Sequence, residues 1–312
     1  MLSEKHKEQL YKQGYRFVGN HSAVKTCQWC RNALRNDGEC YKYLFYGLPS
    51  WRCVQMTPSM GFCPLRCQWC WRDISQAEKA WNGPIDEPND IIDGSIEAQK
   101  KLLIGYKGYE HVNKKRFEEA MNPNQFAISL SGEPTLYPKL PEMITELHKR
   151  DITSFVVSNG TQPDMIEKLA EKNPTQMYIT LPAPNEETFL ESCNPLEGIN
   201  YWKNIQKSLS LLKKFKRSVI RLTLTRGLNM KNAEEYAELI AKAKPNFVEL
   251  KAYMAIGFSR ERVGPKGMPQ FDEIEEFADK LNSVLKYKLS GKSKVSRVLL
   301  LSDGIKKLKI KD

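Results

Sequence analysis

The chain has 312 residues, of which 41% are hydrophobic and 27% charged, and its formal net charge is +11. This length suffices for one large core or two modest ones. No apolar run is long enough to span a bilayer, and the polar, helix-like residues 1–15 lack the apolar segment of a secretory signal. We therefore expect a soluble cytoplasmic protein without a membrane partner.

The positive charge is uneven, with an excess of Lys and Arg in residues 1–72 and 283–312. A basic surface attracts polyanions at long range, so RNA or DNA is the leading class of partner. A surface rich in Lys and Glu that only keeps the protein soluble has the same composition. Charge alone leaves both interpretations open.

The first predicted feature along the chain is a cysteine-rich segment. Seven of the eight cysteines lie between Cys27 and Cys70, and only Cys193 stands apart. In a cytosolic protein this clustering indicates metal binding, because disulfides are rare there. The N-terminal third is therefore predicted to carry metal.

Cys63, Cys67 and Cys70 have the spacing C-x3-C-x2-C. Iron–sulfur clusters are normally held by four thiolates. One short loop with three thiolates can hold a cubane whose fourth iron has no protein ligand and is open to chemistry. The alternative is a zinc site that pairs Cys67 and Cys70 with Cys27 and Cys30, since structural zinc takes four such ligands.

Cys27, Cys40 and Cys53 precede this loop, with twelve residues between each neighbouring pair. Three more thiolates predict a second cluster with its own open iron, a Lewis acid for a carboxylate or carbonyl of a second substrate. Cys30 could replace Cys27, supply a fourth ligand or be a plain buried thiol, and we favour the last.

Beyond the cysteines, short β-branched runs alternate with longer helical patterns. The predicted strands are Val54–Thr57, Phe126–Leu130, Ser154–Ser158, Gln176–Leu181, Val219–Leu224, Phe247–Lys251 and, late in the chain, Arg297–Leu301. The predicted helices are Ser95–Tyr106, Leu140–Lys149, Asp164–Glu171, Tyr201–Lys216, Asn232–Lys244 and Phe271–Tyr287, while Trp81–Asp93 reads as an excursion. Such alternation predicts an α/β fold with a parallel sheet, a complete or partial barrel whose reactive groups gather at the C-terminal strand ends.

Two of these strand ends carry polar motifs. In Ser-Gly-Glu-Pro-Thr at 131–135, Gly132 allows a ligand to approach the backbone, and Pro134 fixes the turn and leaves strand-end carbonyls free. The next strand ends in Ser158-Asn159 followed by Gly160. Either motif could equally form an ordinary turn.

Together, the C-x3-C-x2-C loop and the Gly-Glu-Pro turn one strand–helix unit later resemble the radical S-adenosylmethionine (SAM) superfamily. Within it, the two cysteine sets, Cys70-Trp71-Arg72, and the segments 52–55 and 249–254 resemble the tRNA 4-demethylwyosine synthase family. This resemblance covers nearly the whole chain.

The resemblance implies a partial (βα)6 TIM-like barrel in residues 53–260. A cysteine-rich extension, 1–52, precedes it, and a basic segment, 261–312, packs on it. It also implies SAM and two [4Fe–4S] clusters as cofactors.

For SAM binding, the resemblance implies two groups of residues. The Gly-Glu-Pro turn would hold the ammonium of SAM, and the next strand end would contact its ribose or carboxylate. These residues are Gly132, Glu133, Pro134, Ser158 and Asn159.

The family's reaction joins 1-methylguanosine, next to the anticodon of phenylalanine tRNA (tRNA-Phe), to pyruvate by radical chemistry and gives the tricyclic base 4-demethylwyosine. Lys42 is our candidate for a Schiff base with pyruvate, because a desolvated lysine near other positive charge is a good nucleophile. Pyruvate on the open iron is the competing arrangement. We also expect an external one-electron reductant and a monomer.

Candidate tRNA contacts are Lys251, Tyr253 and Arg260, which follow the sixth strand of the barrel and could stack or pair with an extruded base. Two other function classes stay open. One is a radical SAM enzyme that acts on a peptide or another substrate. The other is a zinc-stabilised nucleic-acid-binding protein.

Overall fold

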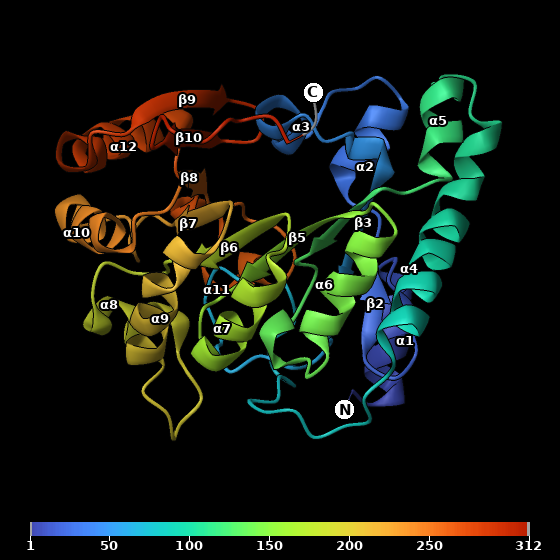
Figure 1. Ribbon diagram of the computed structural model, residues 1–312, viewed down its shortest axis with the longest axis horizontal. Coiled ribbons are helices and arrows are strands. Elements are labelled where there is room, and N and C mark those ends of the chain that lie inside the picture. Colours follow the sequence, from blue (N-terminus) through green and yellow to red (C-terminus); the bar gives the residue numbers. More distant parts are fainter. Residues whose placement is uncertain (1, 311–312) are drawn as a thin grey trace.

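In the computed structural model, residues 2–310 are described and form a ten-stranded sheet (Figure 1). Its order is β1-β2-β3-β4-β5-β6-β7-β8-β10-β9. The strands are β1 (Arg16–Val18), β2 (Ser22–Val24), β3 (Cys53–Thr57), β4 (Gln125–Ile128), β5 (Thr153–Ser158), β6 (Gln176–Thr180), β7 (Ser218–Leu224), β8 (Phe247–Ala252), β9 (Lys288–Ser293) and β10 (Val298–Ser302).

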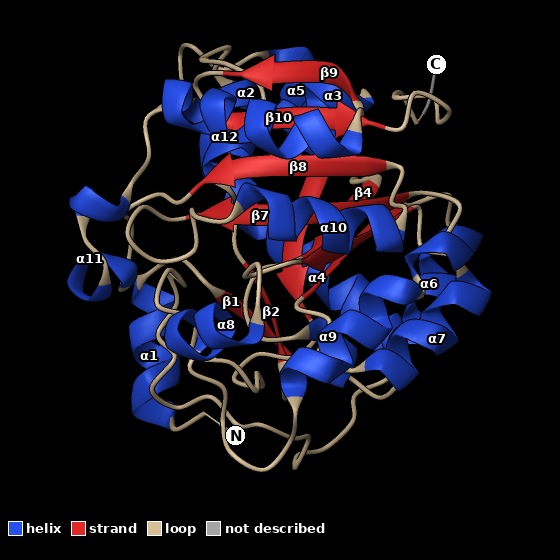
Figure 2. Ribbon diagram, turned by 90° about the vertical axis from the view of Figure 1, so that its left-hand side faces the viewer, coloured by secondary structure: helices blue, strands red, loops and turns tan. Residues whose placement is uncertain are grey.

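Strands β3 to β8 pair in parallel, and each lies next to the strand that precedes it in the chain. Helices return the chain from one strand to the next, and this sequential winding closes the sheet into a partial barrel with the helices outside (Figures 1 and 2). The helices are α1 (Glu4–Lys12), α2 (Gln28–Leu34), α3 (Tyr41–Tyr46), α4 (Pro88–Leu103), α5 (Lys114–Ala120), α6 (Leu140–Lys149), α7 (Pro163–Lys172), α8 (Glu186–Cys193), α9 (Tyr201–Ser210), α10 (Ala233–Ala243), α11 (Ser259–Arg262) and α12 (Phe271–Leu285). The predicted fold class is confirmed.

Both faces of the barrel strands are buried, as expected for parallel strands. Residues on one face, such as Val156 and Ile179, pack against the outer helices in the main core. Alternate residues, such as Phe155 and Tyr178, point into the barrel and form a second core with side chains of α3. Helix α3 therefore covers the N-terminal end of the barrel, where its side chains contact the inward-facing residues of the strands.

Both edges of the barrel carry antiparallel strands that the sequence did not fully reveal. The hairpin β1–β2 adds to β3, and β10 adds to β8 with β9 outside it. Only β10 was predicted; β1 and β2 have three residues each, too few for a clear period-two pattern.

The predicted barrel strands and outer helices are confirmed, with shifted boundaries. The excursion predicted over Trp81–Asp93 is partly wrong, because α4 begins at Pro88, a residue suited to the first helical turn. The helix predicted to reach Lys216 ends at Ser210, and a short 3-10 turn follows before β7. Within residues 2–310, no helix has the length and apolar character needed to cross a membrane.

Candidate active site

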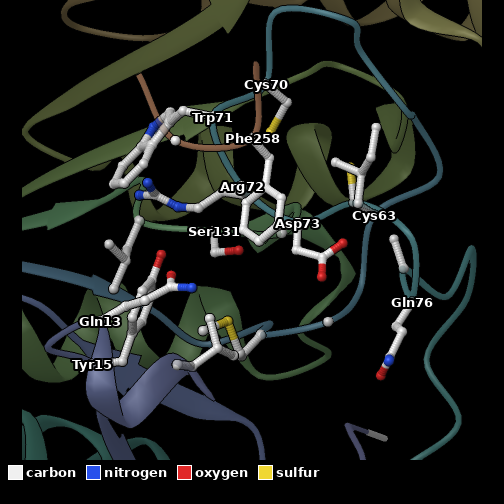
Figure 3. A pocket seen from close by; sticks show the side chains of 18 of the residues that line it. Gln13, Tyr15, Cys63, Cys70, Trp71, Arg72, Asp73, Gln76, Ser131 and Phe258 are labelled. Atoms are coloured by element: carbon white, nitrogen blue, oxygen red, sulfur yellow. The ribbon is translucent and has the colours of Figure 1, made fainter. Parts of the chain in front are cut away.

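Cys63, Cys67 and Cys70 line one pocket of about 710 Å³ beside the C-terminal ends of β3 and β4 (Figure 3). The Cys63 amide donates to the Glu78 carbonyl (2.8 Å), and the Cys70 amide donates to the Cys67 carbonyl (3.0 Å). Burial raises the pKa of the Cys63 and Cys70 thiols, and the neighbouring cysteines raise it further. The loop therefore brings three thiols together at one cavity.

Two distant elements hold this loop in place. The amides of Arg66 and Gln68 donate to carbonyls at the end of α8, each at 2.9 Å. From α11, the Arg262 guanidinium donates to the Gln68 carbonyl (3.2 Å) and to the Cys70 carbonyl. Gly257 touches the loop backbone so closely that an added Cβ would lie 2.3 Å from the Trp71 carbonyl oxygen.

Cys193, the cysteine that stands apart in the sequence, ends α8 beside this loop. A hydrogen bond with the Cys193 thiol is the first cause that raises the pKa of Cys67, and burial adds to it. Neither Cys193 nor Arg262 carries a local sequence signal, so only the fold could reveal their proximity.

The Gly-Glu-Pro turn lies against the same loop. Gly132 has φ +69°, and an added Cβ would stand 2.0 Å from the Ser59 carbonyl oxygen and 2.8 Å from that of Phe62. The neighbouring Glu133 amide donates to the Phe62 carbonyl (2.7 Å). Only glycine fits here, and Pro134 begins the 3-10 turn that follows.

Glu133 connects this turn to the next strand end. Its carboxylate is 1% exposed and accepts from the Ser158 hydroxyl and the Asn159 amide, both at 2.7 Å. Burial raises the pKa of this carboxyl, and the hydrogen bonds offset part of that effect. The Asn159 side-chain amide nitrogen, in contrast to the backbone amide that Glu133 accepts from, lies 3.7 Å from the Cys63 sulfur. The predicted SAM residues and the cysteine loop are thus contiguous.

The second cysteine set comes from three separate elements. Cys27 precedes α2, Cys40 precedes α3, and Cys53 begins β3. Burial and the nearby Cys27 thiol raise the pKa of Cys40 to about 11 and of Cys53 to about 12. Cys30 is buried behind them, and its thiol donates to the Trp51 carbonyl at 3.7 Å.

Lys42 lies beside these thiols and points into the barrel. Its Nζ is 4.8 Å from the ring centroid of Phe155 and 5.5 Å from that of Tyr178. Burial and the Arg221 charge lower the pKa of Lys42. Lys251 shares the interior, with Nζ 5.0 Å from the Tyr41 ring, and burial lowers its pKa to about 8.

Glu249 is the carboxylate among these cations. It is fully buried and pairs with Arg221 at 2.8 Å. Hydroxyls of Tyr46, Tyr178 and Tyr41 donate to it at 2.7, 3.1 and 3.2 Å. Although burial opposes ionisation, Arg221 and these donors keep the pKa of Glu249 below its ordinary value.

The two cysteine sets lie at opposite ends of β3, and the pocket that the first set lines includes none of the second. Across residues 2–310, no three His, Cys, Asp or Glu side chains are placed to hold a single metal ion. A single zinc ion binds each thiolate sulfur at about 2.3 Å, so the sulfurs must converge on one point. A cubane sets its thiolates further apart, because its own iron and sulfide atoms lie between them. The pocket in front of Cys63, Cys67 and Cys70 fits the larger group.

The chain matches two family models. Residues 57–240 match the radical SAM superfamily, and residues 242–303 match the family described as wyosine base formation. The first match covers more than half of the chain and coincides with the barrel.

Two curated relatives match over most of their length. An S-adenosyl-L-methionine-dependent tRNA 4-demethylwyosine synthase of Pyrococcus horikoshii is 45% identical over 299 residues, which cover 94% of this chain and 87% of the relative. The synthase of the same name from Methanocaldococcus jannaschii is 41% identical, with 99% of both chains covered. This chain belongs to the tRNA 4-demethylwyosine synthase family.

Solved structures agree with this membership. A structure of TYW1 with a lysine-pyruvate adduct bound superimposes with a TM-score of 0.88 at 40% identity, covering 99% of this chain and 98% of the other. A crystal structure of archaeal TYW1 gives 0.81 at 38% identity, covering 99% and 100%. As a radical SAM enzyme of the synthase family, the chain uses SAM and a [4Fe–4S] cluster.

The residues predicted to contact tRNA lie in different surroundings within this synthase. Lys251 points into the barrel, as described above. Tyr253 is 1% exposed, and its hydroxyl donates to the Ser259 carbonyl at 3.0 Å, which argues against stacking on a base. Arg260 is exposed, and its Nε donates to the Ala255 carbonyl at 2.9 Å.

Proposed function

We propose that this chain converts 1-methylguanosine, next to the anticodon of tRNA-Phe, into 4-demethylwyosine with carbon atoms from pyruvate. The observation that carries the proposal is the similarity to synthases of this name over 94% and 99% of this chain. The proposal extends to a cytoplasmic monomer that receives single electrons from a separate reductant.

In the first site, the thiolates of Cys63, Cys67 and Cys70 would hold the [4Fe–4S] cluster. SAM bound there would, on one-electron reduction, leave as methionine and a 5′-deoxyadenosyl radical, the species that would take hydrogen from the N-methyl group of the substrate base. The residues of the chain prepare this step. Gly132 lets the Gly-Glu-Pro turn, which would hold the SAM ammonium, pack against the cysteine loop. Glu133 would fix Ser158 and Asn159 at the ribose or carboxylate.

In the second site, we propose that Cys27, Cys40 and Cys53 hold another [4Fe–4S] cluster. Their three sulfurs lie near one another although they come from three elements, which supports a shared ligand. Metal binding would deprotonate these thiols, which are protonated at neutral pH in the absence of metal because their pKa values are raised.

Lys42 is proposed to bind pyruvate. Its lowered pKa favours the neutral amine, which attacks the ketone carbon; one water leaves as the C=N bond forms. A solved relative carries a lysine-pyruvate adduct. Pyruvate on the open iron of the second cluster is the competing arrangement, and Lys251 is the other lysine of the same interior.

The experiment that tests the reaction is anaerobic incubation of reconstituted protein with dithionite, SAM, pyruvate and tRNA that contains 1-methylguanosine. Mass analysis of the nucleosides should show 4-demethylwyosine. SAM cleavage without this product would agree with the superfamily assignment and would refute the proposed substrate.

The lysine is tested separately by borohydride reduction in the presence of pyruvate. We expect the mass increase of the reduced adduct on the peptide that contains Lys42, its loss in Lys42→Ala and its retention in Lys251→Met. Lys42→Ala should also make no product while it still cleaves SAM. Wild-type turnover by Lys42→Ala, or an adduct that maps to Lys251, would refute the assignment.

A further inference from the structure

Arg72, two residues after Cys70, has a buried guanidinium without a hydrogen-bond partner among the described residues. The residue is 7% exposed, and within the described part of the chain none of its three guanidinium nitrogens has a hydrogen-bond partner. Buried charges in proteins are almost always paired, because an unpaired one loses its hydration without compensation. The missing partner must therefore come from outside the chain.

A second cation stands in the same corner of the pocket. Lys25 Nζ lies 4.7 Å from the ring centroid of Tyr15 and 5.5 Å from that of Trp71. The Arg72 guanidinium stacks on the Trp71 ring, and its carbon is 5.9 Å from the Tyr15 centroid. Figure 3 shows Arg72 extending away from Cys63, towards Gln13 and Tyr15.

No carboxylate of the pocket neutralises these two cations. Asp73 is engaged with the Ser75 amide and hydroxyl at 2.9 and 2.7 Å and lies 3.8 Å from His6. Glu261 is exposed at the rim. The corner formed by Lys25 and Arg72, called here the cationic corner, therefore carries positive charge that faces the cavity, and no carboxylate among the described pocket residues neutralises it.

We infer that the cationic corner binds a phosphodiester of the RNA strand next to the nucleotide under modification. This inference rests on the proposed function. A base can reach the pocket only when it leaves its stack, and its backbone enters with it. The planar guanidinium of Arg72 matches two phosphate oxygens, and Lys25 supplies a point charge beside it. The partly exposed rings of Trp71 and Phe258 offer stacking surfaces in the same cavity.

The carboxylate of SAM and the Cys70 thiolate, which interacts electrostatically with Arg72, are the other anionic groups of this pocket. Arg72 points away from Cys63, the sulfur that the Asn159 side-chain amide contacts at 3.7 Å. The direction of the side chain therefore favours the RNA over SAM.

The test uses reconstituted holoenzyme and an anticodon stem-loop RNA that contains 1-methylguanosine. In two modified RNAs, the phosphate on the 5′ or on the 3′ side of that nucleotide is replaced by a neutral methylphosphonate. We expect one of the two methylphosphonate replacements to weaken RNA binding about tenfold. Arg72→Gln should weaken binding of the RNA with all its phosphates by the same factor, because the phosphate replacement and the substitution remove the same charged contact. Arg72→Gln combined with that methylphosphonate should weaken RNA binding little more than either change alone.

Controls separate this contact from other roles. Lys172→Gln removes one exposed positive charge on the far side of the barrel helices and should leave RNA affinity unchanged. For Arg72→Gln, iron content and the KM for SAM in RNA-independent SAM cleavage should equal those of wild type. The salt dependence of log Kd should decrease by about one unit of slope.

Any one of four results would overturn the inference, and the first three concern RNA and SAM binding. They are wild-type RNA affinity in Arg72→Gln, full additivity with both methylphosphonates, or a raised KM for SAM with unchanged RNA affinity. A loss of iron in Arg72→Gln would assign the guanidinium to cluster support and would overturn it too. If the wild-type enzyme forms 4-demethylwyosine, each of these results refutes only the inference about Arg72. Absence of the product from the wild-type reaction refutes the proposed function.

Discussion

The first cysteine set comes from one loop at residues 63–70, whereas the second is assembled from the starts of two helices and a strand. The first set lines a pocket beside the C-terminal strand ends, together with polar groups suited to SAM. The second lies at the opposite end of β3, beside a lysine inside the barrel. The first set therefore faces an open cavity, and the second lies beside a lysine whose pKa burial lowers.

The largest expected effect comes from replacing Cys27 of the second set, and Cys30, three residues later and outside the set, is its comparison. Cys30 is buried and bonded to the Trp51 carbonyl, whereas Cys27 lies beside Cys40 and Cys53. Cys27→Ala should lose about half of the iron and all product formation, while SAM cleavage continues. Cys30→Ala is the matched control and should keep the full iron content and the product formation. Iron analysis and nucleoside mass spectrometry measure the result; the reverse pattern would exchange the two roles.

The stability of the fold should depend on the buried Glu249 carboxylate and its hydrogen bonds inside the barrel. Glu249→Gln leaves Arg221 unpaired near Lys42 and Lys251, and we expect it to lower the free energy of unfolding by about 3–5 kcal/mol at pH 7. Because the folded-state pKa of Glu249 is lowered, its contribution is complete above about pH 4.5 and is lost as pH falls further. Denaturant unfolding at pH 7 and below pH 4.5 should therefore show the difference from wild type shrinking in acid.

Glu167→Gln is the control for that change, because it breaks an exposed pair with Lys214 on the outer helices. It should leave stability unchanged at both pH values. Equal effects of the two substitutions would show that the interior network does not stabilise the fold.

The pocket end should be sensitive to backbone shape. Gly132→Ala would place a Cβ against the Ser59 carbonyl at positive φ, and we expect it to cost about 2 kcal/mol or more and to impair SAM cleavage. Gly227→Ala, also at positive φ but with nothing within 4 Å of the added Cβ, should cost about 1 kcal/mol and leave SAM cleavage intact. Thermal unfolding and SAM turnover compare the two; similar losses of SAM cleavage would remove the role of the turn.

The contrast between the two ends also explains what the sequence could predict. The loop at 63–70, the Gly-Glu-Pro turn and the barrel strands are local patterns, so their existence and order were predictable. Cys193 and Arg262 join the first site only through tertiary contacts, and no local pattern marks them. Lys251 was predicted to face RNA because it ends a barrel strand. Strand alternation instead turns it inwards.

The account depends most on two separate clusters that divide the six cysteines. The direct measurement is iron content and electron paramagnetic resonance of reconstituted wild type and of two triple-alanine variants, one for each cysteine set. We predict about eight irons in wild type and about four in each variant. The spectral change on SAM addition should survive only where Cys63, Cys67 and Cys70 remain. Full iron content after loss of Cys27, Cys40 and Cys53, or a SAM response that depends on them, would contradict the account.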